Sequence, residues 1–452
     1  MSQTSPPGSR EGNLEAPTRH PVDWKDPAFH EQAAIFKELE RVFDICHGCR
    51  RCFSLCQSFP TLFDLVDAAP SGEVEGVEKR AYWSVVDNCY LCDLCYMTKC
   101  PYVPPHPWNV DFPHLMLRAK SFKFVTEGAS VRDRVLSSTD AVGRMAGIPV
   151  VAEVVNAING STLGRKLLSK TLRVHPDAPL PKYHSRSFRS AEAARTRAPI
   201  VPVAAGDTRG KVALFATCYC NRNEPSIDED LVAVFEHNGI AVELSAQERC
   251  CGMPKLELGD LKSVEQLKDA NIPLLASMVE AGCDLVAPIP SCVLMFKQEL
   301  PLLFPTDAAV RLVSEHMYDP FEYLTLRHKA GLLRTDFKVE LGKIAYHVPC
   351  HLRVQNIGLK TRDTLKLVPG TTLEVIERCS GHNGSYAVKQ EFHDAAVKIG
   401  APVVSRVAGS GAVEHSSDCP MAGQQITAAL DGHRPPSHPL TLLRRAYGLA
   451  EN

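Results

Sequence analysis

The hydrophobic and polar positions follow different patterns in the two halves of this chain. Residues 29–43 carry apolar side chains at helical spacing, and residues 113–173 also favour helices. Beyond residue 210, short apolar runs alternate with helical patterns. The predicted elements there are strands at 211–215, 240–244 and 285–287, and helices at 227–237 and within 264–280. Alternation of this kind predicts a parallel sheet covered by helices.

Three other segments have a distinct character. Residues 1–26 contain Pro and Ser and indicate a disordered tail, and residues 174–209 are rich in Pro, Arg, Ala and Ser and indicate an interdomain linker. Residues 145–158 are conspicuously apolar, and basic residues at 165, 166 and 170 follow them. Such a stretch can form an amphipathic patch on a membrane or a partner. A buried core helix is its commoner origin and is the expectation here.

Composition limits the class of protein. The 452 residues suffice for two or three domains, and 44% of them are hydrophobic and 23% charged. A formal net charge of −2 gives no global basic field for nucleic acid. No apolar run is long enough to span a bilayer, so we expect a soluble protein that is peripheral to a membrane at most. The polar first residues lack the apolar core of a signal peptide, which predicts a reducing, cytoplasmic location.

Eight of the 17 cysteines form two tight runs. The runs are Cys46-x2-Cys49-x2-Cys52-x3-Cys56 and Cys89-x2-Cys92-x2-Cys95-x4-Cys100-Pro101. Each resembles the ligand pattern of bacterial ferredoxins, in which three close thiolates and a fourth from the other run hold one [4Fe–4S] cluster. The resemblance implies one cluster on Cys46, Cys49, Cys52 and Cys100 and a second on Cys89, Cys92, Cys95 and Cys56.

The runs depart from the ferredoxin pattern in three details, and other chemistries compete. Gln57 stands where a proline is usual, the second run has four residues before Cys100, and the gap of residues 57–88 is long. A disulfide framework does not suit a reducing compartment. Zinc sites commonly use C-x2-C pairs, but two pairs separated by a longer loop rather than three cysteines at successive intervals. Iron–sulfur clusters are therefore favoured, and a zinc-bound scaffold is the alternative.

The remaining cysteines recur in the same order in two modules. Residues 211–218 are echoed by 343–350, each a predicted strand that leads to a cysteine. Cys250-Cys251-Gly252 is echoed by Cys379-Ser380-Gly381, and 289–292 is echoed by 417–420. Ligands at the carboxyl ends of parallel strands are usual in α/β folds. The repeat therefore predicts two copies of one cysteine-bearing unit.

This arrangement resembles the cysteine-rich CCG domain of heterodisulfide reductase B and D subunits. The same domain occurs in the iron–sulfur subunits of glycolate oxidase and of anaerobic glycerol-3-phosphate dehydrogenase. The resemblance covers residues 30–430 and is closest to the glycerol-3-phosphate dehydrogenase type, with ferredoxin module and duplicated CCG domain on one chain. The terminal CxxC of the family is incomplete in both copies, since Cys292 and Cys419 lack a second cysteine, and the second CCG has become Cys379-Ser380-Gly381.

The resemblance implies a noncubane cluster in CCG domains with complete ligand sets. The first copy offers Cys218, Cys250, Cys251 and Cys292, with Cys220 as a fifth thiol. The second copy offers only Cys350, Cys379 and Cys419, with His351 or His382 as additional candidates, so its occupancy stays open. We expect His47 to adjust the reduction potential of a cluster through hydrogen bonding, and His347 to hydrogen-bond to the backbone. Cys283 is expected to be a small buried residue with a structural role.

The expected fold is an α+β multidomain protein, with an N-terminal helical two-cluster ferredoxin-type domain and C-terminal duplicated α/β CCG domains. The expected divisions are a tail at 1–26, the ferredoxin-type domain at 27–112, a helical segment at 113–173, a linker at 174–209, CCG domains at 210–325 and 326–432, and a C-terminal tail at 433–452.

The resemblance implies an electron-transfer subunit of a multisubunit oxidoreductase. Its partner would be a flavoprotein dehydrogenase for glycerol 3-phosphate or a 2-hydroxy acid, with quinone as a possible acceptor and peripheral contact with the inner face of the cell membrane. No Gly-x-Gly-x-x-Gly fingerprint is present, so a flavin or nicotinamide would belong to the partner. The alternative is a thiol–disulfide reductase whose catalytic residues are Cys250 and Cys251.

Overall fold

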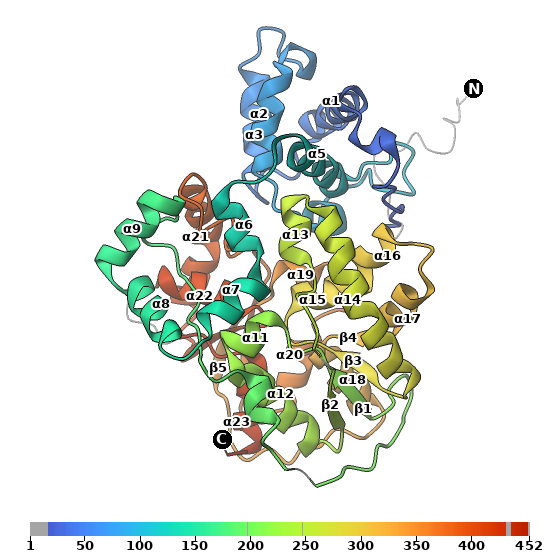
Figure 1. The fold of residues 1–452 in the computed structure, drawn as a ribbon, viewed down its shortest axis with the longest axis vertical. Helices are drawn as coiled ribbons and strands as arrows, with labels where there is room; N and C mark the ends of the chain where they lie inside the picture. The colour runs from blue at the N-terminus through green and yellow to red at the C-terminus, as the bar shows by residue number, and fades with distance from the viewer. Residues whose placement is uncertain (1–16, 197, 246, 431–434, 451–452) are drawn as a thin grey trace, which may run out of the picture. The chain divides into compact units, whose positions relative to one another are not determined.

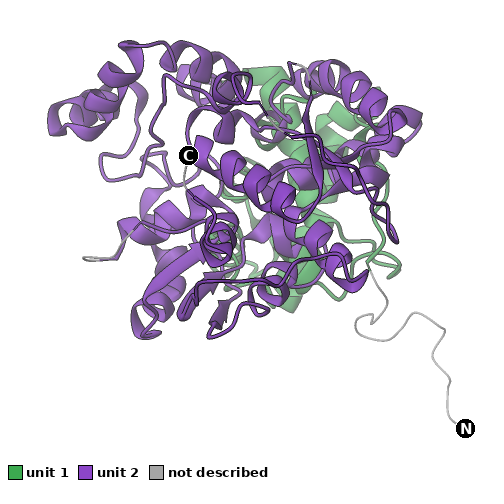
Figure 2. Ribbon diagram, turned by 90° about the horizontal axis from the view of Figure 1, so that it is seen from below, with its two compact units in different colours: residues 1–129, 256–261, 302–304 green, residues 130–255, 262–301, 305–452 purple. Residues whose placement is uncertain are grey.

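The computed structural model describes residues 17–196, 198–245, 247–430 and 435–450. The chain divides into two compact units (Figure 2). Unit 1 contains the residues up to 129 together with 256–261 and 302–304, and unit 2 contains 130–255, 262–301 and 305–452.

Unit 1 is helical and carries both N-terminal cysteine runs. Its elements are η1 Pro27–His30, α1 Gln32–Cys49, α2 Ser58–Asp67, η2 Val74–Gly76, η3 Lys79–Ala81, α3 Tyr82–Asp87, α4 Leu94–Thr98 and α5 Phe112–Glu127. The helix expected at 29–43 is confirmed as α1, whose apolar stripe, including Leu39 and Phe43, is fully buried. Phe43 and Phe59 both pack against Phe112 at the start of α5, so aromatic contacts hold α1, α2 and α5 together.

The expected disordered tail is wrong for residues 17–26, and residues 1–16 lie outside the described residues. Arg19 forms ion pairs with Asp93 at 2.6 Å and with Asp111 at 2.9 Å, close to the second cysteine run. Trp24 is buried and donates from Nε1 to the carbonyl of Leu303 at 3.2 Å. The polar composition of this segment suggested disorder, but Arg19 and Trp24 fix it in place. Composition did not reveal this because their partners lie far along the chain.

The first sheet of unit 2 is parallel and has the strand order β2-β1-β3-β4. Its strands are β1 Lys211–Leu214, β2 Ala241–Leu244, β3 Asp284–Val286 and β4 Met317–Tyr318. The three strands predicted from the apolar runs are confirmed, with Leu214 opposite both Leu244 and Val286 in the register. Val212 to Leu214 are fully buried, as expected for a parallel strand covered on both faces.

The second sheet of unit 2 repeats this order with the strands β6-β5-β7, again all parallel. Its strands are β5 Lys343–His347, β6 Thr372–Ile376 and β7 Glu414–Ser417. In both sheets the first strand in sequence is central, and the next two flank it. A parallel bridge between Ser416 and Ser437 continues the second sheet on the side where β4 continues the first. The two sheets therefore share one topology.

Helices surround both sheets (Figure 1). Before the first sheet lie α6 Val131–Ser137, α7 Thr139–Ala146, α8 Val151–Gly160, α9 Thr162–Leu172 and α10 Phe188–Glu192. With the first sheet come α11 Cys218–Arg222, α12 Pro225–His237, α13 Met253–Leu258, α14 Leu261–Glu280, α15 Pro290–Leu294, the π-helical segment η4 Met295–Glu299, α16 Leu300–Leu303, α17 Ala308–His316 and α18 Pro320–Lys329. With the second come α19 Cys350–Arg353, α20 Lys360–Leu365, α21 His393–Gly409, α22 Pro420–Ala428 and α23 Pro439–Tyr447. The helices predicted at 227–237 and within 264–280 are confirmed as α12 and α14.

The last helix of each module packs on the other module. Helix α18, which follows the first sheet, packs against α20 of the second module, and α23, which follows the second sheet, packs against α12 of the first. Arg444 of α23 pairs with Asp230 of α12 at 2.8 Å, and both are buried. The expected C-terminal tail at 433–452 is therefore wrong for α23, since Leu440, Leu442 and Leu443 belong to the core.

The apolar stretch at 145–158 is not a buried core helix, and that expectation is wrong. The chain turns between α7 and α8, and most of the apolar side chains on this stretch and on α9 are exposed. The exposed ones are Met145, Ile148, Val150, Val151, Val154, Ile158, Leu163 and Leu167. Among the described residues, no single helix has the length and apolar character to cross a membrane, whereas α7 and α8, bent by 107°, meet that test only as a pair.

Replacing Leu443 tests whether α23 is part of the core. Leu443→Ala removes a fully buried side chain, so it should lower the free energy of unfolding by about 2–5 kcal/mol. The matched control Val413→Ala, at a side chain that is 73% exposed, should change it by less than about 0.5 kcal/mol. Anaerobic urea denaturation followed by circular dichroism measures both. Equal effects of the two substitutions would contradict a core role for α23.

Candidate metal centres

The thiols of the first run meet a thiol of the second run in unit 1. Cys46 and Cys49 lie in the last turn of α1, which ends at Arg50 in a left-handed conformation. Burial raises the pKa of the Cys46 thiol well above its usual value, and the neighbouring thiols of Cys52, Cys100 and Cys49 raise it further. Burial also raises the pKa of Cys52 to about 12, with Cys100 and Cys49 again as neighbours. Cys46, Cys49, Cys52 and Cys100 therefore form one group.

A second group forms around Cys95 at the start of α4. Leu91 and Asp93 both have positive φ angles, which turn the backbone between Cys89 and Cys95. Burial raises the pKa of the Cys95 thiol well above its usual value. The thiols that add to this effect are those of Cys52, Cys92, Cys89 and Cys56. The thiols beside Cys95 are thus Cys89 and Cys92 of the second run and Cys52 and Cys56 of the first, so Cys52 is close to both Cys46 and Cys95.

The donor set of these groups suits an iron–sulfur cluster better than a single metal ion. Within the part of the chain that the structure describes, no three His, Cys, Asp or Glu side chains are arranged to hold one ion. A tetrahedral zinc needs four donors at about 2.0–2.3 Å from one centre. In both groups the thiols are close enough to raise one another's pKa. Four thiols are the complete protein ligand set of a [4Fe–4S] cluster.

A third group of thiols lies at the carboxyl ends of the strands of the first sheet. These first-module thiols are Cys218 at the start of α11, Cys250 and Cys251 before α13, and Cys292 in α15. Hydrogen bonds from Cys218 and Cys251 lower the pKa of Cys250 well below its usual value. The pKa of Cys251 is raised well above its usual value by its hydrogen bonds with Cys250 and Cys292. Hydrogen bonds therefore join Cys218, Cys250, Cys251 and Cys292 into one group.

Glycine follows the second cysteine station in both modules for a conformational reason. Gly252 has a φ of 103° and Gly381 a φ of 79°, which side chains with a Cβ rarely adopt. At Gly381 a Cβ would also lie 2.0 Å from the carbonyl oxygen of Ala396. The glycine is thus required by the backbone turn in the second module, although Ser380 stands where the first module has Cys251.

Two residues outside the cysteine motifs complete the first-module site, and no pattern in the sequence pointed to them. The Cys250 backbone N–H donates to Asp140 Oδ2 at 2.7 Å, so the start of α7 touches the CCG turn. From the other side, Asn271 of α14 accepts from the Arg249 N–H at 2.8 Å and donates to the Cys250 carbonyl at 3.0 Å. The segment before the linker therefore belongs to the site.

Two further cysteines of the first module differ in their surroundings. Cys220 is fully buried on α11, and burial raises the pKa of its thiol well above the usual value, with Asp228 as the next cause and Cys292 among its neighbours. It is a candidate fifth thiol of the site. Cys283 lies instead beside Glu243, with its sulfur 3.7 Å from Oε2, and Lys211 pairs with the same carboxylate at 2.8 Å.

The second module has different thiol surroundings. Cys379 Sγ lies 3.3 Å from Asn383 Oδ1 and accepts from the Gly381 N–H at 3.4 Å. Burial raises the pKa of Cys419 to about 11, and the nearby carboxylates that contribute are Glu224 and Asp418. Cys350 starts α19. Hydrogen bonds join Cys250 to two other thiols in the first module, whereas the bonds described for Cys379 are to backbone and amide groups.

Some of the candidate histidines have structural hydrogen bonds, and others lie near a thiol site. His347 bonds to Ser417 Oγ and the Arg378 carbonyl, both at 2.9 Å, and burial lowers its pKa to about 4. His351 of the second module bonds to Ser291 Oγ at 2.8 Å, directly before Cys292 of the first module. Burial lowers the pKa of His382 to about 4, with His351 as a further cause. His47 contacts the Arg50 guanidinium at 3.0 Å from Nδ1.

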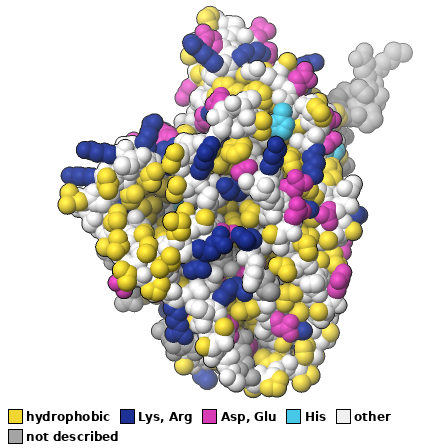
Figure 3. Space-filling model, in the orientation of Figure 1, with side chains coloured by type: hydrophobic (Ala, Val, Ile, Leu, Met, Phe, Trp, Pro, Cys, Tyr) yellow, Lys and Arg dark blue, Asp and Glu magenta, His cyan; other side chains and the backbone are white. Residues whose placement is uncertain are grey.

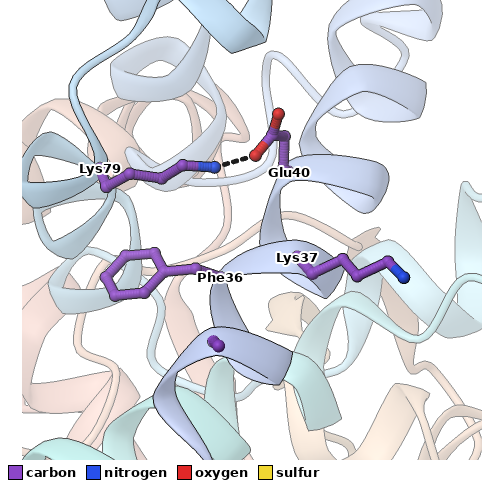
Figure 4. A pocket seen from close by; sticks show the side chains of 5 residues that line it. Phe36, Lys37, Glu40 and Lys79 are labelled. Carbon is purple, nitrogen blue, oxygen red and sulfur yellow. Dashed lines mark hydrogen bonds and ion pairs between the residues drawn. The ribbon is translucent and has the colours of Figure 1, made fainter.

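A separate surface pocket lies on the first half of α1 (Figure 4). It is lined by Ala33, Phe36, Lys37, Glu40 and Lys79, and Lys79 forms an ion pair with Glu40 across it. No cysteine lines this pocket, so it is distinct from the thiol groups.

Comparisons with known proteins find a cysteine-rich domain, dehydrogenase and lactate-utilization relatives, and an iron–sulfur protein. Residues 212–297 match the cysteine-rich CCG domain. The chain is 28% identical to the C subunit of anaerobic glycerol-3-phosphate dehydrogenase from Escherichia coli strain K12 over 75% of this chain and 83% of that protein. It is 31% identical to lactate utilization protein A of Bacillus pumilus over 40% of this chain and 75% of that protein. An uncharacterized iron–sulfur protein of Methanocaldococcus jannaschii is 23% identical over 75% of this chain and 58% of that protein.

Pairs of cysteine substitutions test the two groups in unit 1. Cys46→Ser with Cys100→Ser removes two thiols of one group, so about four irons should be lost and one of the two N-terminal [4Fe–4S] signals should remain. Cys46→Ser with Cys56→Ser removes one thiol from each group, so about eight irons should be lost. Iron analysis and EPR of anaerobically reconstituted protein measure the difference. Identical losses in the two double variants would refute the crossed grouping.

Proposed function

Because this chain belongs to the family of CCG-domain iron–sulfur proteins that includes the C subunit of anaerobic glycerol-3-phosphate dehydrogenase, we propose that it is the electron-transfer subunit of a multisubunit oxidoreductase. The observation that carries the proposal is the meeting of the two N-terminal cysteine runs in two mixed thiol groups. When bound there, [4Fe–4S] clusters supply reversible one-electron transfer.

We assign three clusters to the chain. Two are held by the mixed groups of the ferredoxin-type domain at 27–112, and one by the first-module thiols of the CCG domain at 210–325. The second module spans 326–432 together with α23 and offers three thiols where the first offers four. Its proposed role is to cover the first-module site. Cys89, Cys95, Cys250, Cys251 and Cys292 are buried and the other assigned cysteines are partly exposed, so the chain limits the access of water to these sites without excluding it.

The partner in this proposal is a dehydrogenase that carries its own flavin or nicotinamide. Similar chains are named as parts of systems that act on glycerol 3-phosphate and on lactate, which supports a substrate of the glycerol 3-phosphate or 2-hydroxy acid class for the partner. The acceptor we propose is a quinone, reached from the cytoplasmic face of the membrane.

An exposed apolar surface on α7, α8 and α9 supports contact with that membrane (Figure 3). We call the surface formed by Met145, Ile148, Val150, Val151, Val154, Ile158, Leu163 and Leu167 the α8–α9 patch. Residues 144–173 carry five basic residues (Arg144, Arg165, Lys166, Lys170 and Arg173) and a single acidic one, Glu153. Apolar side chains with a basic surround suit the interface of an anionic bilayer, and monomeric proteins seldom expose large apolar patches without a use.

Vesicle binding tests the α8–α9 patch. Leu163→Glu replaces a side chain that is 82% exposed with a charge, and should weaken binding to phosphatidylglycerol-containing vesicles about tenfold or more. Val201→Glu is the matched control, because Val201 is also 82% exposed but lies outside the patch. Cosedimentation measures both. Equal binding of the two variants, or no binding of the unmodified protein, would rule out a membrane role for the patch.

The acidified thiol of Cys250 favours one second candidate function, a thiol–disulfide reductase that acts at the first-module site. Substitution separates the two functions. In an electron-transfer subunit, Cys250→Ser and Cys251→Ser should leave both N-terminal [4Fe–4S] EPR signals in place, and the unmodified protein should not reduce glutathione disulfide with reduced methyl viologen as donor. Steady disulfide turnover that both substitutions abolish would establish the reductase instead.

The proposed electron transfer is tested on the intact chain. After anaerobic reduction with dithionite and removal of the excess, the two N-terminal clusters should give reduced [4Fe–4S] EPR signals. These signals should disappear on mixing with menadione, a soluble quinone analogue. If the protein holds iron but shows no reducible signal, or if the signals persist with menadione, the proposed role is wrong.

A further inference from the structure

The start of α7 lies on the first-module thiols although it precedes the CCG module by about 70 residues in the sequence. Asp140 accepts the backbone N–H of Cys250 at 2.7 Å, and α7 packs against α11, the helix that begins with Cys218. Helix α7 therefore contacts two of the stations that supply thiols. Neither the cysteine motifs nor the matched domain at residues 212–297 includes this helix.

Thr139, the residue before Asp140, directs its hydroxyl into the same site. Its Oγ1 is buried, and none of the described residues places a partner at the distance and angle of a regular hydrogen bond to it. The thiols within its hydrogen-bonding reach are those of Cys218 and Cys250. A buried hydroxyl without a partner is costly unless a ligand or a charged neighbour uses it. A thiolate at either cysteine would supply that partner.

Helix capping does not account for this hydroxyl. Thr139 is the first residue inside α7, and Ser138 occupies the N-cap position without a side-chain capping bond. Thr162 is the corresponding first residue of α9, where Ser161 does make the capping bond, and its side chain is exposed. The two threonines share a helix position, but only Thr139 is next to thiols.

We propose that Thr139 and Asp140 are positioning residues of the first-module cluster. Asp140 fixes the backbone of Cys250 in the CCG turn, and the Thr139 hydroxyl donates a hydrogen bond to a ligating sulfur of Cys218 or Cys250. This inference rests on the proposed cluster at the first-module thiols. Reduction of such a cluster adds negative charge that spreads onto its ligand sulfurs, so a donor aimed at them favours the reduced form.

The Thr139 hydroxyl is tested by its effect on a reduction midpoint. Thr139→Val keeps the shape of the side chain but removes the donor, so the equilibrium between reduced and oxidised first-module cluster should shift about tenfold toward the oxidised form, which is about 59 mV. Thr139→Ser should retain the midpoint of the unmodified protein, and Thr162→Val is the control. EPR-monitored redox titration measures all three, with the N-terminal clusters as an internal reference.

The outcomes of that titration are distinguishable. If the unmodified protein shows no first-module signal, the proposed third cluster fails. If the signal is present but Thr139→Val and Thr162→Val give the same first-module midpoint, the inference about Thr139 is wrong. The proposed function would still stand. A shift shared equally by the N-terminal clusters would also overturn the inference, because the hydroxyl described here lies beside Cys218 and Cys250.

The Asp140 carboxylate is tested by cluster content. Asp140→Asn keeps an oxygen that can accept the Cys250 N–H, so the first-module cluster should remain. Asp140→Ala leaves that buried N–H without its acceptor and should cause loss of about four irons, while both N-terminal signals persist. Iron analysis with EPR measures this. Equal iron content in Asp140→Asn and Asp140→Ala would show that the carboxylate does not hold the turn.

Discussion

The parallel pairing of β2, β1 and β3 is the constraint on which the first-module site depends. Because parallel strands end at the same edge of a sheet, the residues that follow them meet although they are far apart in the sequence. Cys218 follows β1, Cys250 and Cys251 follow β2, and Cys292 follows β3. The central position of β1 places Cys218 between the other two stations. The shared pKa effects of these thiols result from this strand order.

The second sheet keeps the strand order of the first, although its module has three thiols where the first has four. The second module has a structural role. Each module supplies the helix that covers the other, with α23 on α12 and α18 on α20. The second module also reaches the first site directly, since His351 bonds to Ser291 beside Cys292, and Gln424 bonds to Tyr219 beside Cys218. Loss of the second module would therefore uncover the first site, whatever metal the second one holds.

The sequence predicted the elements whose signals are local. The apolar runs identified β1, β2 and β3, helical spacing identified α1, and cysteine spacing identified the residues that gather in unit 1. It did not predict α23 as core, because the partner of that helix, α12, lies about 200 residues earlier. It also missed Asp140, whose role depends on a single contact with the Cys250 backbone. Composition misjudged residues 17–26 and 145–158 because burial is decided by tertiary partners.

The central claim is that this chain holds three clusters, two in the mixed thiol groups of unit 1 and one in the first module alone. Iron and acid-labile sulfide analysis of the anaerobically reconstituted, unmodified protein tests it most directly. The account predicts about twelve irons and about twelve sulfides per chain. About eight of each would show that the first-module thiols hold no cluster, about sixteen would show that the second module also holds one, and zinc in place of iron would contradict the account altogether.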